Sequence, residues 1–563
     1  MLFDDLRAIQ REFGYLTPAK LKELAANTGV PLHRVHEVAS FYPVFHLEPQ
    51  PKVNVGICSD LACHMRGADR LYTRLKQRFQ SAAIGVAVQE ISCVGQCEGA
   101  PAISINDIIL NHMDAAEAEN LIAVALSGIP IPHPPLESPA GPLSSDPYAG
   151  KESYGALRRL AATGNWESVI ADLKAAGLGG MGGAGFPAHI KWDLVRKTAA
   201  DEKYVVCNAD ESEPGTIKDR FILERLPHLV VEGMVLAALV VGAQRGYIYI
   251  RHEYEQQAKI LQAELERCRR RNLLGDSILG SGLSFDIEMF ISPGGYICGE
   301  GSALLEALEG KRAEPRNRPP NSATQGLWQK PTVLNNVETF AIVPQILEMG
   351  VDWFKAQGRG GASGLKFVAV TGDVRFPGVF EIPMGTPASE VIMEMAGGPP
   401  PGQQVKAFAP SGAASGFLPA SKIDVALDFK SMAAAGSMLG SGAIVVLSNQ
   451  RCMLDMALNA VKFFRNESCG KCVPCRIGSQ KLVEMLTGWT RGISAATDRE
   501  LIDELCETLK LTSICGLGQF IPYPIQTVLQ YFPDEVKAHV MDKRCPAGVC
   551  SIRRDFVKGA DSR

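Results

Sequence analysis

The sequence predicts a multi-domain α/β protein. With 563 residues, the chain is too long for one domain, since domains usually hold about 100–200 residues. Short alternating apolar runs, which predict strands, are followed by segments with helical spacing in both halves of the chain. Hydrophobic residues make up 46% and charged residues 21%, which is typical of globular proteins. We therefore expect several domains with separate cores.

The composition excludes some classes of function. The net charge is −4 and long basic runs are missing, so we expect no nucleic-acid partner. The most apolar run, residues 229–243, contains Glu232 and is shorter than the roughly 18 residues that predict a membrane span. The N-terminus lacks the features of a secretory signal. Fifteen cysteines, unevenly clustered, argue against a disulfide framework and for a reducing, cytoplasmic compartment.

Residues 1–50 predict a helical prefix. Leu6, Ile9 and Phe13 keep helical spacing, and Gly14 can end that helix. A second helix is expected from Thr17-Pro18 to residue 28, and a third over residues 33–41. We expect this prefix to pack against another part of the protein and to carry no chemistry of its own.

Residues 51–128 predict a small α/β domain with a cysteine site. A strand over residues 53–57 ends at Cys58, and a second strand over residues 86–92 ends at Cys93. Cys63 and Cys97 follow these two on loops. Four thiolates can bind zinc or a 2Fe–2S cluster, and the four-residue gap between Cys58 and Cys63 favours the cluster.

Residues 129–150 predict a linker between two formerly separate proteins. Seven prolines occur here among glycines and serines, and such segments are semi-rigid. The prolines are Pro130, Pro132, Pro134, Pro135, Pro139, Pro142 and Pro147.

Residues 151–362 predict an α/β domain that binds a phosphate group. Six glycines fall within residues 177–185, and Phe186-Pro187 and a helical run follow them. A glycine loop before a helix presents free N–H groups to an anion, and Lys191 adds a charge about one turn into that helix. The spacing is neither G-x-G-x-x-G nor G-x-x-x-x-G-K-[ST]. The glycines alone are therefore equally compatible with a flexible linker or a tight turn.

Polar residues at other segment ends strengthen the prediction of a binding site. A strand over residues 203–207 leads into a loop, another over 285–291 leads into a glycine turn, and two amides follow later in the chain. Such groups suit the hydroxyls of a sugar chain, a flavin edge or a carboxamide. They are Asn208, Asp210, Glu211 and Glu213, then Tyr296, Gly299 and Glu300, then Asn335 and Asn336.

The last two segments predict a small β-rich domain, residues 363–448, and a helical domain, residues 449–563. The helical domain contains Cys469-x2-Cys472-x2-Cys475 with a distant Cys515. This pattern is typical of a 4Fe–4S cluster, whereas three closely spaced ligands would crowd a zinc ion. We interpret Cys545 and Cys550 as structural, because these two thiols have no partner set. Cys207, Cys268, Cys298, Cys452 and Cys506 are interpreted as buried thiols and not as ligands.

Two sets of strings resemble the complex I family. ICSDLAC and SCVGQCEGAPAI are similar to the small thioredoxin-like 2Fe–2S subunit of NADH-quinone oxidoreductase. GMGGAGFPAHIKW, CNADESEPGTIKDR, GGYICGE, LEGKR and PTVLNNVET are similar to its flavin- and NADH-binding subunit. The resemblance implies a thioredoxin-like domain, an FMN-binding domain, a ubiquitin-like β-grasp insert over residues 363–448 and a C-terminal helical bundle.

The same resemblance implies the cofactor contacts. Phe186 would stack on the adenine of NADH and Glu213 would lie near its nicotinamide. Met181 and Gly301 depart from the usual arginine and glutamate of complex I. The implied FMN contacts are Gly180, Gly182, Lys191, Asn208, Asp210, Glu211, Tyr296, Gly299, Glu300, Asn335 and Asn336.

The implied activity is a diaphorase reaction. Hydride would pass between NAD(H) and FMN, and single electrons between FMN and the two iron–sulfur clusters; we name no catalytic side chain. GGYICGE, EPRNRPP, FAPSG, SMLGSGAIVV and CPAGVC resemble the β-subunit of NAD-linked formate dehydrogenases. That resemblance implies a separate α-subunit with further iron–sulfur clusters and a molybdenum or tungsten pterin site. An input module of complex I or of a hydrogenase, a cofactor-free scaffold and a flavin–thiol disulfide reductase are the alternatives.

Overall fold

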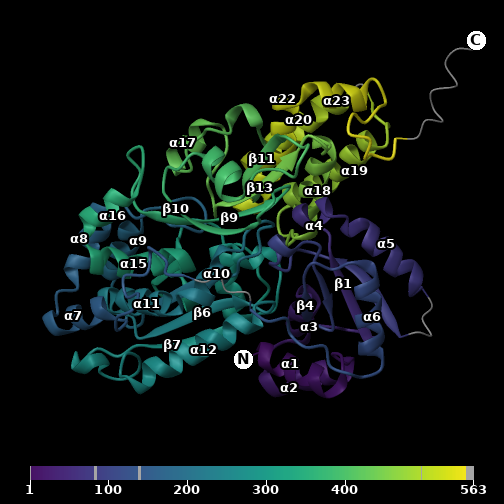
Figure 1. Cartoon of the computed structure of the whole chain (residues 1–563). Coiled ribbons are helices and arrows are strands. Elements are labelled where there is room, and N and C mark those ends of the chain that lie inside the picture. Colours follow the sequence, from purple (N-terminus) through teal and green to yellow (C-terminus); the bar gives the residue numbers. More distant parts are fainter. Residues whose placement is uncertain (1, 81–84, 137–140, 496, 553–563) are drawn as a thin grey trace, which may run out of the picture.

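The computed structural model describes residues 2–80, 85–136, 141–495 and 497–552. The described residues form three sheets surrounded by helices (Figure 1). We refer to the N-terminal region (residues 2–126), the central region (155–357), the β-rich region (365–448) and the C-terminal helices (453–540). Among the residues that the structure describes, every helix is too short or too polar to span a bilayer.

The predicted helical prefix is present as α1 (Leu2–Phe13), α2 (Pro18–Thr28) and α3 (Leu32–Phe41). The Thr17 hydroxyl accepts from the Lys20 N–H at the start of α2, and Gly29 ends it at φ 71°. The prefix packs on the central region. The Phe3 ring lies 5.8 Å from that of Phe290, and Arg7 donates to the Ile291 carbonyl at 2.6 Å.

The rest of the N-terminal region contains a four-stranded sheet in the order β2-β1-β3-β4. The two strands that end near the cysteines run parallel, so their ends lie at the same edge. Cys63, which was expected on a loop, lies instead on the short helix α4 (Leu61–Met65). The elements are β1 (Val53–Cys58), α4 (Leu61–Met65), α5 (Ala68–Arg78), β2 (Val86–Ile91), β3 (Ile103–Ile105), β4 (Ile108–Leu110) and α6 (Ala115–Leu126).

The described part of the proline-rich segment lies against the central and β-rich regions. His133 pairs with Glu255 at 3.2 Å, and the N–H groups of Ser144 and Ser145 donate to Glu381 at 2.8 Å. Tyr148 is buried and donates to Glu232 at 3.0 Å. These contacts fix the segment against the two regions, whereas a linker needs only to connect them. Pro139, one of the predicted prolines, lies outside the described residues.

The central region is a parallel sheet in the order β7-β6-β5-β8 with helices on both faces. Helices α11 and α15 pack so closely that a Cβ on Gly233 would lie 2.0 Å from the Phe340 carbonyl oxygen. The elements are α7 (Gly155–Thr163), α8 (Glu167–Ala176), α9 (Ala188–Lys197), β5 (Tyr204–Ala209), α10 (Lys218–Arg225), α11 (Pro227–Val241), β6 (Arg245–Arg251), α12 (Glu255–Arg270), β7 (Asp286–Ser292), α13 (Gly301–Leu308), α14 (Ser322–Gln325), β8 (Thr332–Asn336), α15 (Val337–Met349) and α16 (Val351–Gln357).

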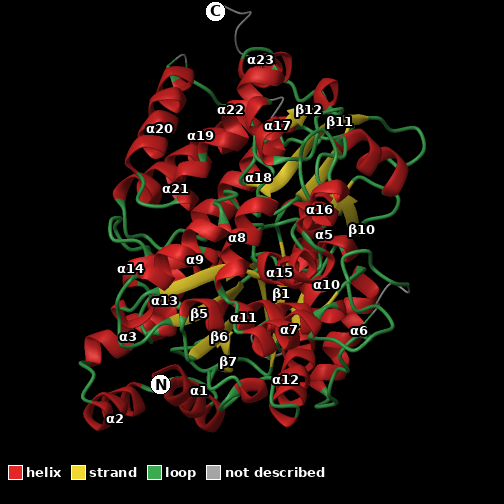
Figure 2. Ribbon diagram, turned by 90° about the vertical axis from the view of Figure 1, so that its left-hand side faces the viewer, coloured by secondary structure: helices red, strands yellow, loops and turns green. Residues whose placement is uncertain are grey.

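The β-rich region is a mixed sheet in the order β10-β9-β13-β11-β12, and the C-terminal helices gather beside it (Figure 2). Three of these strands were expected from the sequence, near residues 367–371, 378–382 and 443–447, and the other two were not. The strands and their helix are β9 (Leu365–Gly372), β10 (Gly378–Pro383), β11 (Val405–Ala413), β12 (Leu418–Pro419), α17 (Phe429–Ala434) and β13 (Ala443–Ser448). The later helices are α18 (Met453–Asn466), α19 (Ser479–Thr490), α20 (Asp498–Thr512), α21 (Gly516–Phe520), α22 (Pro522–Tyr531) and α23 (Pro533–Val540).

Candidate functional site: a nucleotide pocket between two cysteine sets

The predicted pocket residues lie at one edge of the central sheet. Strands β5, β7 and β8 belong to one parallel sheet, so their carboxyl ends face the same way. In such sheets ligands bind at this edge. The edge therefore brings together Asn208 to Glu213 after β5, the turn at Tyr296 after β7, and Asn335 and Asn336 at the end of β8.

The glycine-rich loop reaches this edge and leads into α9, as predicted. The Gly180 N–H donates to the Phe186 carbonyl at 2.9 Å, which folds the loop back on itself. Lys191 is half-buried and donates to the Leu334 carbonyl at 2.5 Å and to Asn335 Oδ1 at 2.9 Å. Burial lowers the pKa of Lys191 to about 8. Lys191 thus holds the loop and the end of β8 together.

One glycine of the loop is required by close packing. A Cβ on Gly182 would lie 2.8 Å from the Asn336 Cβ, whereas a Cβ on Gly183 would meet nothing within 4 Å. We expect Gly182→Ala to push the loop from β8 and weaken FMN binding on the order of tenfold, since overpacking costs about 1–3 kcal/mol. Fluorescence titration of the flavin-depleted protein measures this, with Gly183→Ala as the matched control. Equal affinity of both variants would contradict the assignment of this loop.

The acidic loop after β5 contacts two other segments, the second glycine turn and the start of α10. Asn208 donates to the Gly299 carbonyl at 2.8 Å, which joins this loop to the second glycine turn. Both carboxylate oxygens of Glu211 are used inside the protein, because they accept from the N–H groups of Asp219 and Arg220 at 2.8 and 3.0 Å. Glu211 therefore anchors the start of α10. Burial raises the pKa of Asp210 and of Glu211 to about 7.

The second glycine turn contains Tyr296, Gly299 and Glu300. The Tyr296 phenol bonds to Glu213, and its ring lies 4.9 Å from that of Phe463. Glu300 accepts from the N–H groups of Ser302 and Ala303, both at 2.9 Å, and so caps α13. It also pairs with the exposed Arg318 at 2.5 Å. At the departure position Gly301, an added Cβ would lie 2.6 Å from Leu334.

Several features of this edge fit a flavin nucleotide. Asp210 Oδ1 and Asn335 Nδ2 are buried without a partner in the protein, and buried polar groups normally have one. A polar ligand would supply those partners. Phe186 is 53% exposed beside the glycine loop, where its ring can stack on an aromatic base. Met181, in contrast, is buried in the core.

The β-rich region contacts the acidic loop of the predicted binding site, a role that sequence reasoning missed. The Ala414 N–H donates to Glu213 at 2.9 Å, and the Ser441 and Thr216 hydroxyls lie 2.9 Å apart. A Cβ on Gly412 would lie 2.9 Å from Glu213. The sequence offered no signal for these contacts, because they join segments about 200 residues apart.

Burial raises the pKa of Glu213 from its ordinary value of 4.5 to about 7. The folded chain therefore keeps a proton here between about pH 4.5 and pH 7 that the unfolded chain has released. The free energy of unfolding falls across that interval as the pH rises. We expect Glu213→Gln to remove about 3 kcal/mol of this pH-dependent fall in the free energy of unfolding, since one pKa unit corresponds to about 1.4 kcal/mol. Thermal unfolding at several pH values measures it, with Glu500→Gln as an exposed control; an unchanged pH profile would contradict the burial argument.

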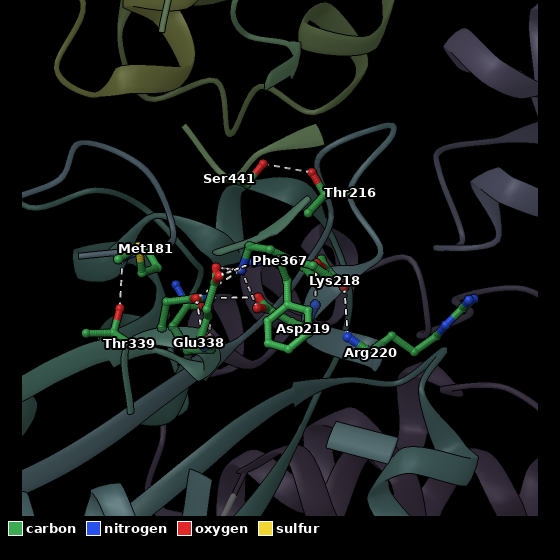
Figure 3. Close-up of polar contacts among 12 residues, drawn as sticks. Met181, Thr216, Lys218, Asp219, Arg220, Glu338, Thr339, Phe367 and Ser441 are labelled. Atoms are coloured by element: carbon green, nitrogen blue, oxygen red, sulfur yellow. Dashed lines mark hydrogen bonds and ion pairs between the residues drawn. The ribbon is translucent and has the colours of Figure 1, made fainter. Parts of the chain in front are cut away.

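A network of buried charged side chains lies next to the predicted binding site and contacts Asn336. The carboxylate of Glu338 lies 3.0 Å from Lys366 Nζ and 3.1 Å from Lys218 Nζ, and it accepts from the Phe367 N–H at 2.8 Å. Lys218 also contacts Asp219 at 2.5 Å and Asn336 Oδ1 at 3.1 Å. Figure 3 shows Lys218, Asp219, Glu338 and Phe367 gathered in one cluster. Sequence reasoning missed these charges, because each looks like an ordinary surface residue.

The first cysteine set comes together at the edge of the N-terminal sheet. Cys58, Cys63, Cys93 and Cys97 are all buried, and the thiols of Cys93 and Cys97 lie 3.3 Å apart. The Cys58 thiol contacts those of Cys63 and Cys93. This set borders the central region, since the Gly215 N–H donates to Cys97 Sγ at 3.3 Å and Arg251 donates to the Cys93 carbonyl at 2.6 Å.

The second cysteine set lines one cavity among the C-terminal helices. Cys469, Cys472 and Cys475 border it together with Cys515, which precedes α21. The fourth thiol therefore arrives from elsewhere in the fold, as the spacing predicted. Lys471 also lines the cavity, and the Ser468 hydroxyl lies 3.1 Å from Cys475 Sγ. These neighbours suit the negative charge of a thiolate cluster.

Glu467 joins the two cysteine sets to the pocket. It lies two residues before Cys469, and it accepts from the Tyr296 N–H at 2.6 Å. Its other oxygen contacts the hydroxyl of Ser92, the residue before Cys93. Glu467 is half-buried, and desolvation raises its pKa. One side chain at the entry to the second cysteine loop thus contacts the second glycine turn and the first cysteine loop, and only the fold could reveal this.

The interpretation of Cys545 and Cys550 as thiols without a partner set was wrong, because Cys452 lies beside them. The structure brings them together with His539, and the four ligand atoms lie within 4.8 Å of one another. The Cys545 and Cys550 pair was visible in the sequence, but Cys452 lies 87 residues before His539. No short motif could therefore have shown the set.

Comparisons with known proteins agree with this architecture. Residues 173–345 match the Nuo51 FMN-binding domain, and residues 1–125 match the thioredoxin-like [2Fe-2S] ferredoxin family. Residues 455–539 match the iron-sulfur binding region of NADH-ubiquinone oxidoreductase-F, and residues 367–415 match the SLBB domain. These matches favour the clusters over zinc at both predicted cysteine sets.

Similar proteins come from two kinds of complex. The NADP-reducing hydrogenase subunit HndC of Solidesulfovibrio fructosivorans is 43% identical over 73% of this chain and 83% of its own. An NADH-quinone oxidoreductase subunit of Rhizobium meliloti is 42% identical over 73% of this chain and 97% of its own. The NAD-reducing hydrogenase HoxS subunit alpha of Cupriavidus necator is 33% identical over 95% of this chain and 91% of its own.

A solved structure of an NAD+-reducing [NiFe]-hydrogenase in the H2-reduced state is also similar. It has a TM-score of 0.86 and 31% identity, over 95% of this chain and 93% of that one. The similarity therefore includes the N-terminal region as well as the central one. The chain belongs to the family of NAD(H)-linked diaphorase subunits shared by NADH-quinone oxidoreductases and hydrogenases, with a [2Fe-2S] thioredoxin-like domain fused to the FMN-binding and [4Fe-4S] domains.

Proposed function

We propose that this chain exchanges electrons between NAD(H) and two iron–sulfur clusters through FMN. The contacts of Glu467 carry the proposal, because they join the pocket turn at Tyr296 to both cysteine loops. When bound, FMN accepts a hydride from NADH and releases electrons singly, which iron–sulfur clusters require.

In this proposal the residues of the chain bind and orient FMN and NAD(H). Lys191 and the glycine loop hold the nucleotide end, while Asn208, Asp210 and Asn335 offer polar atoms to the flavin. Phe186 provides an exposed ring for the adenine, and Glu213, bonded to Tyr296 and Ala414, lies where the nicotinamide would enter. Gly180, Gly182, Tyr296, Gly299, Glu300 and Asn336 complete the proposed set, with Glu211 acting through the start of α10.

For the complex that owns this chain, we propose an NAD-linked formate dehydrogenase. The strings EPRNRPP, FAPSG, SMLGSGAIVV and CPAGVC support this. In that case formate is oxidised on a separate subunit with further iron–sulfur clusters and a molybdenum or tungsten pterin site. The second candidate is a hydrogenase or complex I-like assembly. The HoxS subunit alpha favours it, since the match covers 95% of this chain.

Purification of the native complex through a tag on this chain separates the candidates. The first proposal predicts NAD+ reduction with formate and co-purified molybdenum or tungsten. Nickel in the complex and NAD+ reduction with H2 would contradict the first proposal and identify the complex as a hydrogenase. NADH oxidation by a quinone without formate or H2 activity would indicate a complex I-like assembly.

A further inference from the structure

A third set of potential metal ligands lies outside the two cysteine sets described above. Cys452, His539, Cys545 and Cys550 form the one group of at least three His, Cys, Asp or Glu ligand atoms within 4.8 Å of one another among the described residues. We propose that these four side chains bind a single structural zinc ion.

The distances fit one tetrahedral ion. Cys452 Sγ lies 3.4 Å from His539 Nε2 and 3.6 Å from Cys550 Sγ. Zinc–sulfur bonds of about 2.3 Å at tetrahedral angles place sulfurs about 3.8 Å apart. All four ligand atoms are close enough to surround one ion, whereas a cluster would separate its ligands by its own width. Three thiolates with one imidazole are also a common zinc ligand set.

The histidine is already oriented as a ligand. His539 is fully buried on α23, and its Nδ1 lies 2.8 Å from the Glu535 carbonyl oxygen. A hydrogen on Nδ1 that donates to this carbonyl leaves the lone pair of Nε2 directed at the three sulfurs. Metal-binding histidines generally donate their other ring N–H in this way.

The surrounding structure holds the remaining ligands in place. Cys452 is 1% exposed and lies at the start of α18, where the Met453 N–H donates to Glu535 at 3.0 Å. The same residue, Glu535, therefore contacts the segments of two ligands. Cys545 and Cys550 lie on the turn after α23, and Gly548 in that turn takes φ 70°. Its N–H donates to the Cys545 carbonyl at 3.1 Å, which bends the chain back toward the site.

The position indicates what the ion would do. It would join the chain after α23 to the first turn of α18, and the far end of α18 leads directly into the cysteine loop of the second set. The 14 residues of α18 separate the two ends by about 21 Å at 1.5 Å per residue. The zinc would thus stabilise the helix from which that loop extends, and it would take no part in electron transfer.

Metal analysis of the full chain, purified without chelators, tests the proposal. We expect one zinc ion per chain in addition to the iron, and zinc K-edge X-ray absorption with sulfur ligands and one nitrogen ligand. Cys545→Ser and His539→Gln are expected to lower the zinc content at least tenfold while FMN and iron contents stay unchanged. Cys506→Ser, a buried thiol on α20 outside this set, is the matched control and is expected to keep its zinc.

The X-ray absorption measurement needs no variant, so a poorly folding substitution leaves the test intact. A full chain without zinc, a zinc signal from oxygen ligands, or iron bound at these four residues would each overturn the proposal. Unchanged zinc in both ligand variants would overturn it as well.

Discussion

Replacing Cys475 with serine is expected to abolish the 4Fe–4S cluster while leaving the flavin pocket and the 2Fe–2S cluster intact. Cys475 is buried and lines the cavity shared by its cysteine set. Loss of a ligand should lower electron delivery to the proposed partner subunit more than about 100-fold, since even changes around metal ligands cost about 10–100-fold. NADH should still bleach the flavin in this variant.

The measurement combines iron content, low-temperature EPR and NADH-dependent electron delivery in the intact complex. Cys268→Ser serves as the control, because Cys268 is a fully buried thiol on α12 outside every cysteine set described above. Wild-type delivery by Cys475→Ser would show that electrons leave the chain by another route.

Replacing Glu338 with glutamine is expected to cost about 3–5 kcal/mol of stability, the usual result of removing one partner from a buried ion pair. Glu338 is fully buried, and burial alone would raise its pKa, but Lys366 and Lys218 offset this and lower it. Without that charge, Lys366 would be a buried cation whose hydrogen bond to the Met181 carbonyl is long, at 3.4 Å. Chemical unfolding followed by tryptophan fluorescence measures the loss.

Two further variants make the Glu338 test specific. Glu348→Gln alters a more exposed pair with Arg159 near the end of the same helix, α15, and should cost less than about 1 kcal/mol. The double variant Glu338→Gln, Lys366→Met should regain part of the loss, because it removes the unpaired cation. A single variant as stable as the wild type would show that the network contributes little.

The sequence predicted the parts of this protein that depend on short spacing. The strands ending at Cys58 and Cys93, the Cys469 to Cys475 run and the glycine loop before α9 all have local signals. Their fold placements agree with the predictions because cysteine spacing, glycine turns and strand periodicity are fixed by neighbouring residues. The parallel sheet then brings the ends of β5, β7 and β8 to one edge.

The sequence did not predict contacts between distant segments. Glu467 resembles any glutamate before a cysteine motif, and Lys366 any lysine at the start of a strand. Ala414 contributes a backbone N–H, which leaves no trace in residue type. The set of Cys452 and His539 was missed for the same reason, since two helices must pack before the ligands meet.

Titration of the isolated chain with NADH under anaerobic conditions tests the central claim most directly. Absorbance follows the flavin, and EPR follows the iron. The structure, with its pocket joined to both cysteine loops through Glu467, predicts that NADH bleaches the flavin and that two distinct paramagnetic iron signals follow. A flavin that stays oxidised, or a bleached flavin without paramagnetic iron, would contradict the proposed path.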